Sequence, residues 1–289
     1  MRPAPFEYLA PRTKHEAVDL MTGTDGSVLP LAGGQSLVAL LNARAIRPRI
    51  VLDLNRVPGL DGIEVTASSV RVGAMTRTRT IESSGPLREA LPILPAAAAR
   101  VATVQIRYRS TVGGSLCHAD PAAHLPTVAV ALGADLLLLS STGVRTVPAE
   151  EFFVDEFRTA RRPDELLTDI EFPRLPGLTY RFTEVTRRGH LGFPLVGLCA
   201  GFEIQGGRFT AVRMAASGVG PQPLRLRAAE QMLLSCRVTA DPAAVAEKAV
   251  ACTAPRTDLH GDAGYRRDLL RILICRTLND AAAKRNRDD

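Results

Sequence analysis

The chain has 289 residues, of which 46% are hydrophobic and 23% are charged, and its formal net charge is +6. This length fits two domains or one large one, and the composition excludes a disordered chain, a collagen, a coiled coil and a protein with an apolar membrane span. The positive charge comes almost entirely from scattered arginines that are not interleaved with aromatic residues, and this argues against nucleic-acid binding. The N-terminus lacks an apolar signal segment, which favours a cytoplasmic protein.

The segment before residue 58 contains two predicted strands and two predicted helices. Thr13-x-x-Glu16 has the pattern of a capping box and predicts a short helix that begins after Thr13. Residues 28–31 predict a strand at a sheet edge, because Pro30 has no N–H for a ladder hydrogen bond. The remaining predictions are a loop over 32–36, a helix over 37–43 and a strand over 50–54.

The middle of the chain alternates between strands and helices. Residues 79–102 predict helix with interruptions at three prolines, Pro86, Pro92 and Pro95. Asp120 before Pro121 predicts an N-cap and the first turn of a helix that ends near residue 132. The other predictions are a hairpin (63–66 with 70–72), a second loop (111–116) and strands over 134–139, 144–147 and 165–172.

Residues 173–177, with two prolines and a glycine, form the clearest linker in the sequence. After this linker the pattern changes to a small antiparallel sheet followed by helices. The predicted strands are 180–186, 195–204 and 209–216, and the predicted helices begin near 226 and cover 242–251 and 265–283. Alternating elements before the linker, and a sheet followed by helices after it, predict a two-lobed α+β protein.

Two glycine-containing segments of one design, Ala32-Gly33-Gly34-Gln35-Ser36 and Val112-Gly113-Gly114-Ser115, are the most informative feature. Glycine lets successive N–H groups face one point, where they bind an anion, and the serine hydroxyl adds another donor. One such segment is most often an ordinary turn, but two could hold the linked phosphates of a dinucleotide. Neither segment has the G-x-G-x-x-G or Walker A pattern, so a Rossmann or P-loop fold is not indicated.

Other reactive residues give weaker signals. The five cysteines are widely spaced without a C-x-x-C pair, so no zinc or iron–sulfur site is expected in this chain. Cys117, His118, Asp120 and His124 are the densest group of possible ligands, but we favour a capped helix beside a ligand loop and no metal. Phe193 either packs in the core or stacks on a planar ligand. No catalytic acid, base or nucleophile is assigned.

The chain resembles the FAD-binding medium subunits of the molybdenum hydroxylases, the group of carbon monoxide dehydrogenase, xanthine dehydrogenase and aldehyde oxidase. Residues 32–37 are similar to the first flavin loop of that family, and residues 111–115 with their continuation 117–123 are similar to the second. Gly218-Val219-Gly220-Pro221 and Tyr265-Arg266-Arg267 resemble signatures of its carboxyl domain. Several motifs in the right order over the whole chain make this resemblance specific.

The resemblance implies a fold and a cofactor. The fold is a two-lobed FAD-binding domain of the PCMH or vanillyl-alcohol-oxidase-like type over residues 1–175, with lobes of about 1–57 and 58–175. A smaller α+β domain, like the C-terminal domain of the carbon monoxide dehydrogenase flavoprotein, covers 178–284. The residues implied to contact FAD are Leu31, Ala32, Gly33, Gly34, Gln35, Ser36, Leu37, Val101, Thr111, Gly113, Gly114, Ser115, Asp120, His124, Leu167 and Phe193.

The resemblance also implies a role in a larger complex. A molybdenum-binding large subunit would oxidise the substrate, and the 2Fe–2S clusters of a small subunit would pass the electrons to the FAD of this chain. NAD, a quinone or dioxygen would then accept them. The molybdenum cofactor and the iron–sulfur clusters are expected only on these partners, which agrees with the absence of cluster cysteines here.

Three departures from the family pattern keep two alternatives open. Ser115 replaces the usual asparagine, His124 stands where an acidic residue usually contacts the adenosine part, and residues 187–193 lack the usual Gly-Asp. The alternatives are a stand-alone FAD oxidoreductase and a scaffold subunit that has lost redox function. If the pocket has decayed, Ser115→Asn and His124→Asp should raise the FAD affinity.

Overall fold

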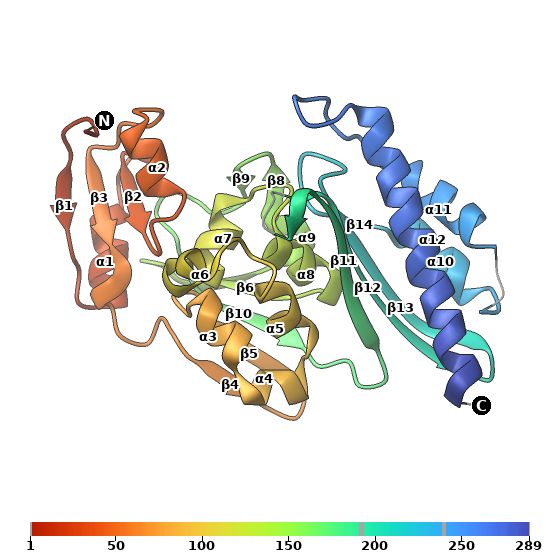
Figure 1. Cartoon of the computed structure of the whole chain (residues 1–289). Coiled ribbons are helices and arrows are strands. Elements are labelled where there is room, and N and C mark those ends of the chain that lie inside the picture. The colour runs from red at the N-terminus through yellow and green to blue at the C-terminus, as the bar shows by residue number, and fades with distance from the viewer. Residues whose placement is uncertain (1, 191–193, 239–240, 289) are drawn as a thin grey trace.

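The computed structural model describes residues 2–190, 194–238 and 241–288. The chain builds a small sheet near the N-terminus, a larger sheet in the middle and a third sheet covered by the C-terminal helix, as Figure 1 shows from red to blue. Helices lie between these sheets and outside them. Within the described part of the chain, no helix combines the length and the apolar character needed to cross a membrane.

The N-terminal sheet has three parallel strands in the order β1-β3-β2. Its elements are β1 (Glu7–Leu9), α1 (Lys14–Met21), β2 (Val28–Leu31), α2 (Leu37–Asn42), β3 (Ile50–Asp53) and the short η1 (Leu54–Arg56). Thr13 caps α1 as predicted, since its hydroxyl accepts a hydrogen bond from Glu16 N (3.0 Å). Pro30 lies in an edge strand, also as predicted, because β2 pairs only with β3.

The middle of the chain forms a five-stranded antiparallel sheet in the order β4-β5-β10-β6-β7. Its strands are β4 (Ile63–Val65), β5 (Ser69–Gly73), β6 (Asp135–Ser140), β7 (Gly143–Pro148) and β10 (Leu166–Pro173), and a short hairpin is made by β8 (Phe153–Asp155) and β9 (Arg158–Thr159). The helices are α3 (Thr78–Ser83), α4 (Gly85–Ala90), α5 (Ile93–Ala98), α6 (Val104–Arg109), α7 (Val112–His118), α8 (His124–Leu132) and α9 (Ala149–Phe152). The five strands of this sheet agree with the predicted strands, whereas β8, β9, α6 and α9 were not predicted.

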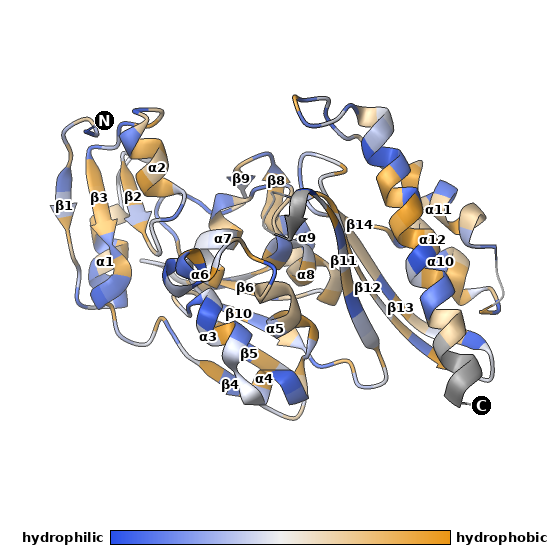
Figure 2. Ribbon diagram, viewed as in Figure 1, coloured by the Kyte–Doolittle hydropathy of each residue, from blue (hydrophilic) through white to orange (hydrophobic). Residues whose placement is uncertain are grey.

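The third sheet is antiparallel, in the order β11-β12-β13-β14. Its strands are β11 (Thr179–His190), β12 (Pro194–Gln205), β13 (Arg208–Ser217) and β14 (Leu224–Arg225), followed by α10 (Arg227–Leu234), α11 (Pro242–Val250) and α12 (Ala263–Asp288). Helix α12 packs against β12 and β11 and contributes four leucines and Ile274 to the core of this half, and it alternates between hydrophobic and hydrophilic bands in Figure 2.

Helix α8 connects the two larger sheets. Every one of its residues is buried, and it packs against β12 and β13 on one side and against the core below β10 on the other. A helix whose residues are all buried and mostly apolar is typical of such a position between two layers. The two larger sheets therefore share a continuous core through α8.

Three local predictions were wrong. Pro95 does not interrupt a helix but lies in the first turn of α5, where a proline N–H would have no partner in any case. Asp120 and Pro121 do not begin a helix: they form a turn in which Asp120 Oδ1 accepts from Ala122 N (2.9 Å), and α8 begins at His124. The segment 112–116 is not a loop but the start of α7.

One ion pair of the five-stranded sheet, between the buried Glu165 and the partly exposed Arg145, makes the stability of the sheet dependent on pH. Glu165 accepts from Arg145 Nε (2.5 Å), Arg145 Nη2 (2.9 Å) and the backbone N–H of Arg162 (2.7 Å). Burial alone would raise the pKa of the Glu165 carboxyl, but these bonds and the Arg145 charge hold it below its usual value. The pair thus stabilises the fold fully above about pH 4.5, and the stabilisation is lost as the pH falls through the lowered pKa.

We therefore expect Glu165→Gln to lower the free energy of unfolding by about 1–2 kcal/mol at pH 7, and this deficit to shrink below about pH 4. Urea unfolding of both proteins at pH 7 and at low pH measures it. Glu171→Gln is the control, since the exposed Arg71–Glu171 pair (3.4 Å) should contribute little at pH 7. A deficit for Glu165→Gln that is equal at both pH values would contradict the expectation.

Candidate functional site

The first glycine segment is a loop at the carboxyl end of β2 and leads into α2. Gly34 has a φ of +74°, in the left-handed region that favours glycine. Among the described residues, the backbone N–H groups of residues 33–36 donate no hydrogen bond to any acceptor. An internal hydrogen bond holds the loop, since Gln35 Nε2 donates to Gly33 O (3.1 Å). This loop has free donors for an anion, as the sequence predicted.

The second glycine segment is built differently. Thr111 is the N-cap of α7, and its hydroxyl accepts from Gly114 N (3.0 Å). Val112 N donates to Thr76 O (3.1 Å) and Gly113 N donates to Ala74 O (2.8 Å). The N–H groups that were expected to face an anion are thus already bonded within the protein. The prediction of a second anion-binding loop was wrong, because the cap and the end of β5 take these donors.

The glycines of α7 instead allow close packing. A Cβ on Gly113 would lie 2.5 Å from the Cβ of Ala74 and 2.7 Å from its carbonyl oxygen. A Cβ on Gly114 would lie 2.8 Å from Thr111 Oγ1 and 3.5 Å from the Cβ of Ala32. The start of α7 can therefore sit directly against both β5 and the first glycine loop.

The two segments meet at one place. A Cβ on Gly33 would lie 2.2 Å from Arg109 O and 2.7 Å from Ser110 Cα, so the first loop approaches the backbone that leads into α7 more closely than any side chain allows. Together with the contact between Ala32 and Gly114, this brings the three-stranded sheet and the helical region around α7 into one site. The predicted convergence of the two segments is thus present.

A polar network fixes this junction. Arg77 donates to Arg109 O (2.7 Å) and to Asn55 Oδ1 (2.6 Å), and Asn55 Nδ2 donates to Ala32 O (3.1 Å) and Asp53 Oδ1 (2.5 Å). Burial, and then the nearby positive charge of Arg109, lower the pKa of the Arg77 guanidinium. Two guanidinium groups and four free N–H groups face one carboxylate here, that of Asp53, so donors and positive charge predominate at the junction, which suits a phosphate.

A pocket of about 450 Å³ opens at this junction. It is lined by Leu31, Ala32, Gly33, Gly34, Gln35, Val38, Ala39, Asn42, Asp53, Asn55 and Arg109. Its floor lies at the carboxyl ends of the parallel strands β2 and β3, which is where open parallel sheets bind ligands. Although burial would raise the pKa of the Asp53 carboxyl, hydrogen bonds from Tyr8 and Asn55 hold it below its usual value.

Sequence reasoning missed the polar residues of this site, Asp53, Asn55, Arg77 and Arg109, and the residues Val38, Ala39 and Asn42 on the α2 side of the pocket. The signal for two of them was available, since Asp53 and Asn55 directly follow a strand that the sequence predicted. Arg109 stands two residues before Thr111, the first residue of the second motif. Arg77 had no signal, because its place depends on the bridge that it forms with Thr111 across a distant part of the chain.

Four further predicted residues do not line this pocket. Val101 follows α5 and packs partly buried against the core, and Leu167 is buried in β10. Asp120 lies in the turn between α7 and α8, and His124 is buried at the start of α8. Phe193 lies outside the described residues. Glu184 of β11 contacts both His124 and Arg100, the residue before Val101.

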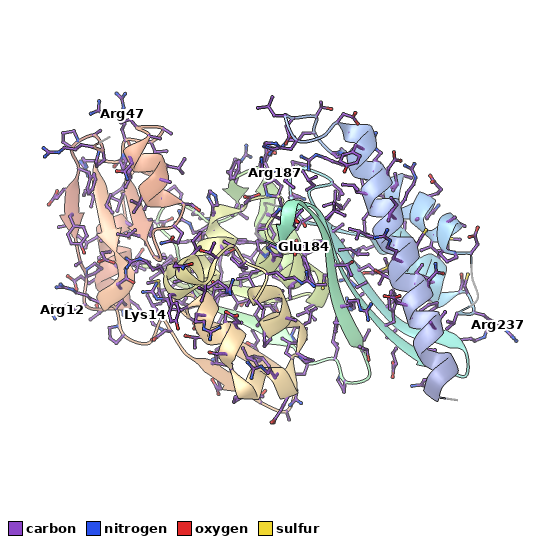
Figure 3. The ribbon with its side chains drawn as sticks, viewed as in Figure 1. Arg12, Lys14, Arg47, Glu184, Arg187 and Arg237 are labelled. Carbon is purple, nitrogen blue, oxygen red and sulfur yellow. The ribbon has the colours of Figure 1, made fainter. Side chains whose placement is uncertain are left out.

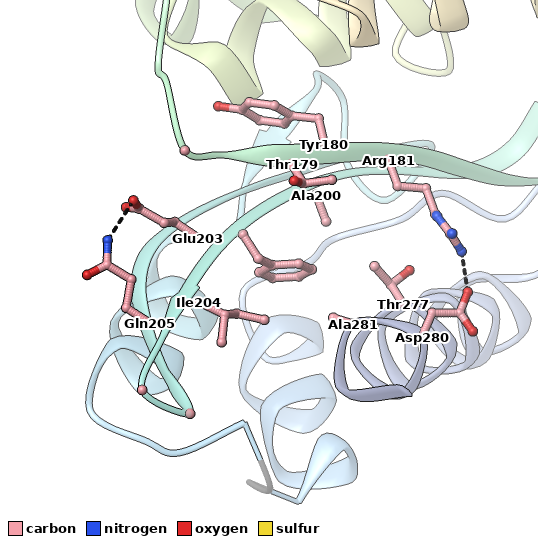
Figure 4. A pocket seen from close by; sticks show the side chains of 14 residues that line it. Thr179, Tyr180, Arg181, Ala200, Glu203, Ile204, Gln205, Thr277, Asp280 and Ala281 are labelled. Carbon is pink, nitrogen blue, oxygen red and sulfur yellow. Dashed lines mark hydrogen bonds and ion pairs between the residues drawn. The ribbon is translucent and has the colours of Figure 1, made fainter. Parts of the chain in front are cut away.

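A larger cleft, of about 560 Å³, lies elsewhere, between the lower ends of β11 and β12 and the C-terminal part of α12 (Figure 4). Arg181 and Asp280 form an ion pair across it, and Gln205 Nε2 donates to Glu203 Oε1 (3.0 Å) at its rim. None of the predicted cofactor residues lines this cleft. The chemistry suited to a dinucleotide is therefore at the smaller pocket.

The possible metal ligands near α7 do not form a cluster. His118 lies against the ring of Phe157 (ring centres 5.1 Å apart), and His124 pairs with a glutamate. Within the described ranges, no three histidine, cysteine, aspartate or glutamate side chains gather as a metal site would require.

The whole chain matches known proteins. The family described as "FAD binding domain in molybdopterin dehydrogenase" matches residues 4–175, and the family described as "CO dehydrogenase flavoprotein C-terminal domain" matches residues 180–281. A relative from Paenarthrobacter nicotinovorans, the 6-hydroxypseudooxynicotine dehydrogenase complex subunit alpha, is 37% identical over 97% of this chain and 96% of its own length.

Solved structures agree over the same length. A chain of carbon monoxide dehydrogenase from Hydrogenophaga pseudoflava superposes with a TM-score of 0.94 at 34% identity, covering 98% of this chain and 99% of that one. A chain of quinoline 2-oxidoreductase from Pseudomonas putida 86 superposes with a TM-score of 0.92 at 34% identity, with the same coverage. The similarity thus includes both halves of the chain and their relative arrangement.

Proposed function

Because this chain belongs to the FAD-binding medium subunits of the molybdenum hydroxylases, we propose that it is the electron-transfer subunit of such a complex. It would receive electrons from the iron–sulfur clusters of a partner and pass them to an external acceptor. The family, the α+β fold and the FAD-binding domain predicted from the sequence are confirmed by the comparisons, and the chain is an oxidoreductase subunit. The junction of the two glycine segments is the observation that carries the proposal.

The residues at this junction fit FAD. A diphosphate would find two kinds of donor here: the free N–H groups of residues 33–36 and the guanidinium of Arg109. Because Gly33 has no Cβ, the first loop can lie close to the backbone of Arg109. Leu31, Ala32 and Leu37 flank them. When bound, FAD would supply the electron-accepting chemistry, while the protein supplies binding and electrostatics.

The other predicted residues would act around this centre. Thr111, Gly113, Gly114 and Ser115 would form the support against which the first loop is held. Val101, Asp120, His124, Leu167 and Phe193 would contact the rest of FAD. We propose that residues 1–175 form the FAD-binding domain, with lobes of about 1–57 and 58–175, and that 178–284 form the second domain. The stretch between β10 and β11 supports this division.

The proposed partners are a molybdenum-binding large subunit and a small subunit with 2Fe–2S clusters, in the cytoplasm, with NAD, a quinone or dioxygen as acceptor. The similarity to a protein named as one subunit of a dehydrogenase complex supports partners of this kind.

The test is to express the chain alone and with the candidate partner subunits, and to record the visible spectrum of the purified protein. We expect flavin absorption and release of FAD on denaturation, and bleaching of this absorption by substrate only when both partners are present. A folded complex that yields no FAD would overturn the proposal. Bleaching by a substrate without partners would instead support a stand-alone oxidoreductase.

A further inference from the structure

The domain interface contains a buried carboxylate that the function described so far does not use. Glu184 lies on β11, on the sheet face that is turned toward α8 (Figure 3). Its Oε2 lies 2.7 Å from His124 Nε2, and its Oε1 lies 3.0 Å from Arg100 Nη1. The side chains of Glu184 and His124 are each only 8% exposed, so both ends of the contact are withdrawn from water.

The carboxylate is held as an anion. Burial alone would raise the pKa of Glu184, but the hydrogen bond and charge of His124, and then those of Arg100, keep it below the usual value. Since an ionised carboxylate has no proton to give, His124 Nε2 is the donor in their hydrogen bond. Such charge-assisted bonds are stronger than bonds between neutral groups.

Packing leaves this arrangement little freedom. The imidazole of His124 lies against the ring of Phe182, with ring centres 5.2 Å apart. On the neighbouring strand, Gly197 is paired with Glu184, and a Cβ there would lie 3.1 Å from the Phe182 ring. Glycine at this position therefore leaves room for the Phe182 ring that packs on His124.

The two partners of Glu184 come from segments that carry proposed cofactor residues. His124 is itself one of them, and Arg100 directly precedes Val101. Arg107 holds the same segment from inside by donating to Val101 O (3.0 Å) and to the following carbonyl. One carboxylate of the second domain thus fixes two separate walls of the FAD-binding domain.

We propose that Glu184 is a positioning residue of the FAD site, so that the site is complete only when the C-terminal domain is docked. This inference rests on the proposed function. Glu184 sets the positions of His124 and of the Val101 segment, and it compensates for the histidine at position 124 by bringing an acidic group to it from β11. The structure therefore reverses the expectation for His124→Asp: an aspartate there would face Glu184, and FAD affinity should fall.

The test compares FAD dissociation constants of the full chain, measured by quenching of flavin fluorescence, with thermal unfolding temperatures. We expect Glu184→Gln to raise the dissociation constant about tenfold, because a charge-assisted bond is lost. His124→Asp should do the same or more. The double exchange His124→Glu with Glu184→His restores the imidazole–carboxylate hydrogen bond in reversed order and should recover most of the affinity.

The matched control is Glu230→Gln. Glu230 has a side-chain exposure of 7% and lies on α10, and its printed hydrogen-bond partners, Arg225 and Met214, both belong to the third sheet. This variant should lower the unfolding temperature and leave the FAD dissociation constant within about twofold. A visible circular dichroism spectrum of bound flavin, recorded at saturating FAD, should change for Glu184→Gln and not for Glu230→Gln.

The outcomes separate the two proposals. If the unmodified chain binds FAD and Glu184→Gln leaves both affinity and flavin spectrum unchanged, the positioning role is refuted and the proposed function stands. An equal loss of affinity in Glu230→Gln would also refute it, since general destabilisation would then explain the effect. If the unmodified, folded chain binds no FAD, both proposals fail.

Discussion

Replacing Gly33 with alanine should weaken FAD binding at least tenfold, because the new Cβ would lie 2.2 Å from Arg109 O. This oxygen belongs to the backbone and accepts a hydrogen bond from Arg77 (2.7 Å), so it cannot turn aside as a flexible side chain would. The first loop must then move away from α7 by about an ångström, which takes its free N–H groups out of place. Titration of the apo chain with FAD, followed by flavin fluorescence, measures the effect.

Gly85→Ala is the control for this substitution. Gly85 is the first residue of α4, and a Cβ there would meet nothing within 4 Å. The free energy of unfolding should change by less than about 1 kcal/mol, and FAD affinity should stay the same. If Gly33→Ala bound FAD as tightly as Gly85→Ala does, the junction would not be the diphosphate site.

The largest loss of stability is expected from Glu230→Ala. Glu230 accepts from Arg225 Nε (3.0 Å), Arg225 Nη2 (3.1 Å) and the backbone N–H of Met214 (2.7 Å). The Arg225 side chain is only 6% exposed, so removal of its partner leaves a buried positive charge without compensation. We expect a loss of about 3–5 kcal/mol in the free energy of unfolding, measured in urea.

Glu247→Ala is the comparison for this substitution. Glu247 also accepts two hydrogen bonds from one arginine, Arg271 (2.5 and 3.2 Å), but its side chain is 62% exposed. Water replaces the lost partner at such a surface site, so the loss should be much smaller. Equal losses in the two variants would show that burial does not set the strength of these pairs.

Local sequence patterns predicted most of the elements, because each depends on residues close in the chain. The capping box at Thr13 and the proline in the edge strand β2 are examples. The wrong predictions came from the same patterns where a distant group intervened. Asp120 caps a turn and not a helix, and the N–H groups before Gly114 are taken by Thr76 and Ala74. No window of sequence contains those partners.

The candidate site shows the same division. The glycine segments could be recognised because their geometry is local, whereas Arg77 and Glu184 could not. Arg77 connects the end of the three-stranded sheet with the backbone before α7, and Glu184 reaches across the domain interface to His124. Their roles depend on how the sheets pack against each other, and that packing cannot be predicted from the spacing of residues along the chain.

The contact of Gly33 with Arg109 also joins two sheets that have no strand in common. The donors of the first loop belong to the small parallel sheet, and the surface that backs them belongs to the region around α7. A slight rotation of the small sheet about this seam, the contact between Gly33 and Arg109, would move the N–H groups of the first loop away from the region around α7. Every strand would stay intact. Binding of a diphosphate by the first loop therefore depends on this seam staying closed.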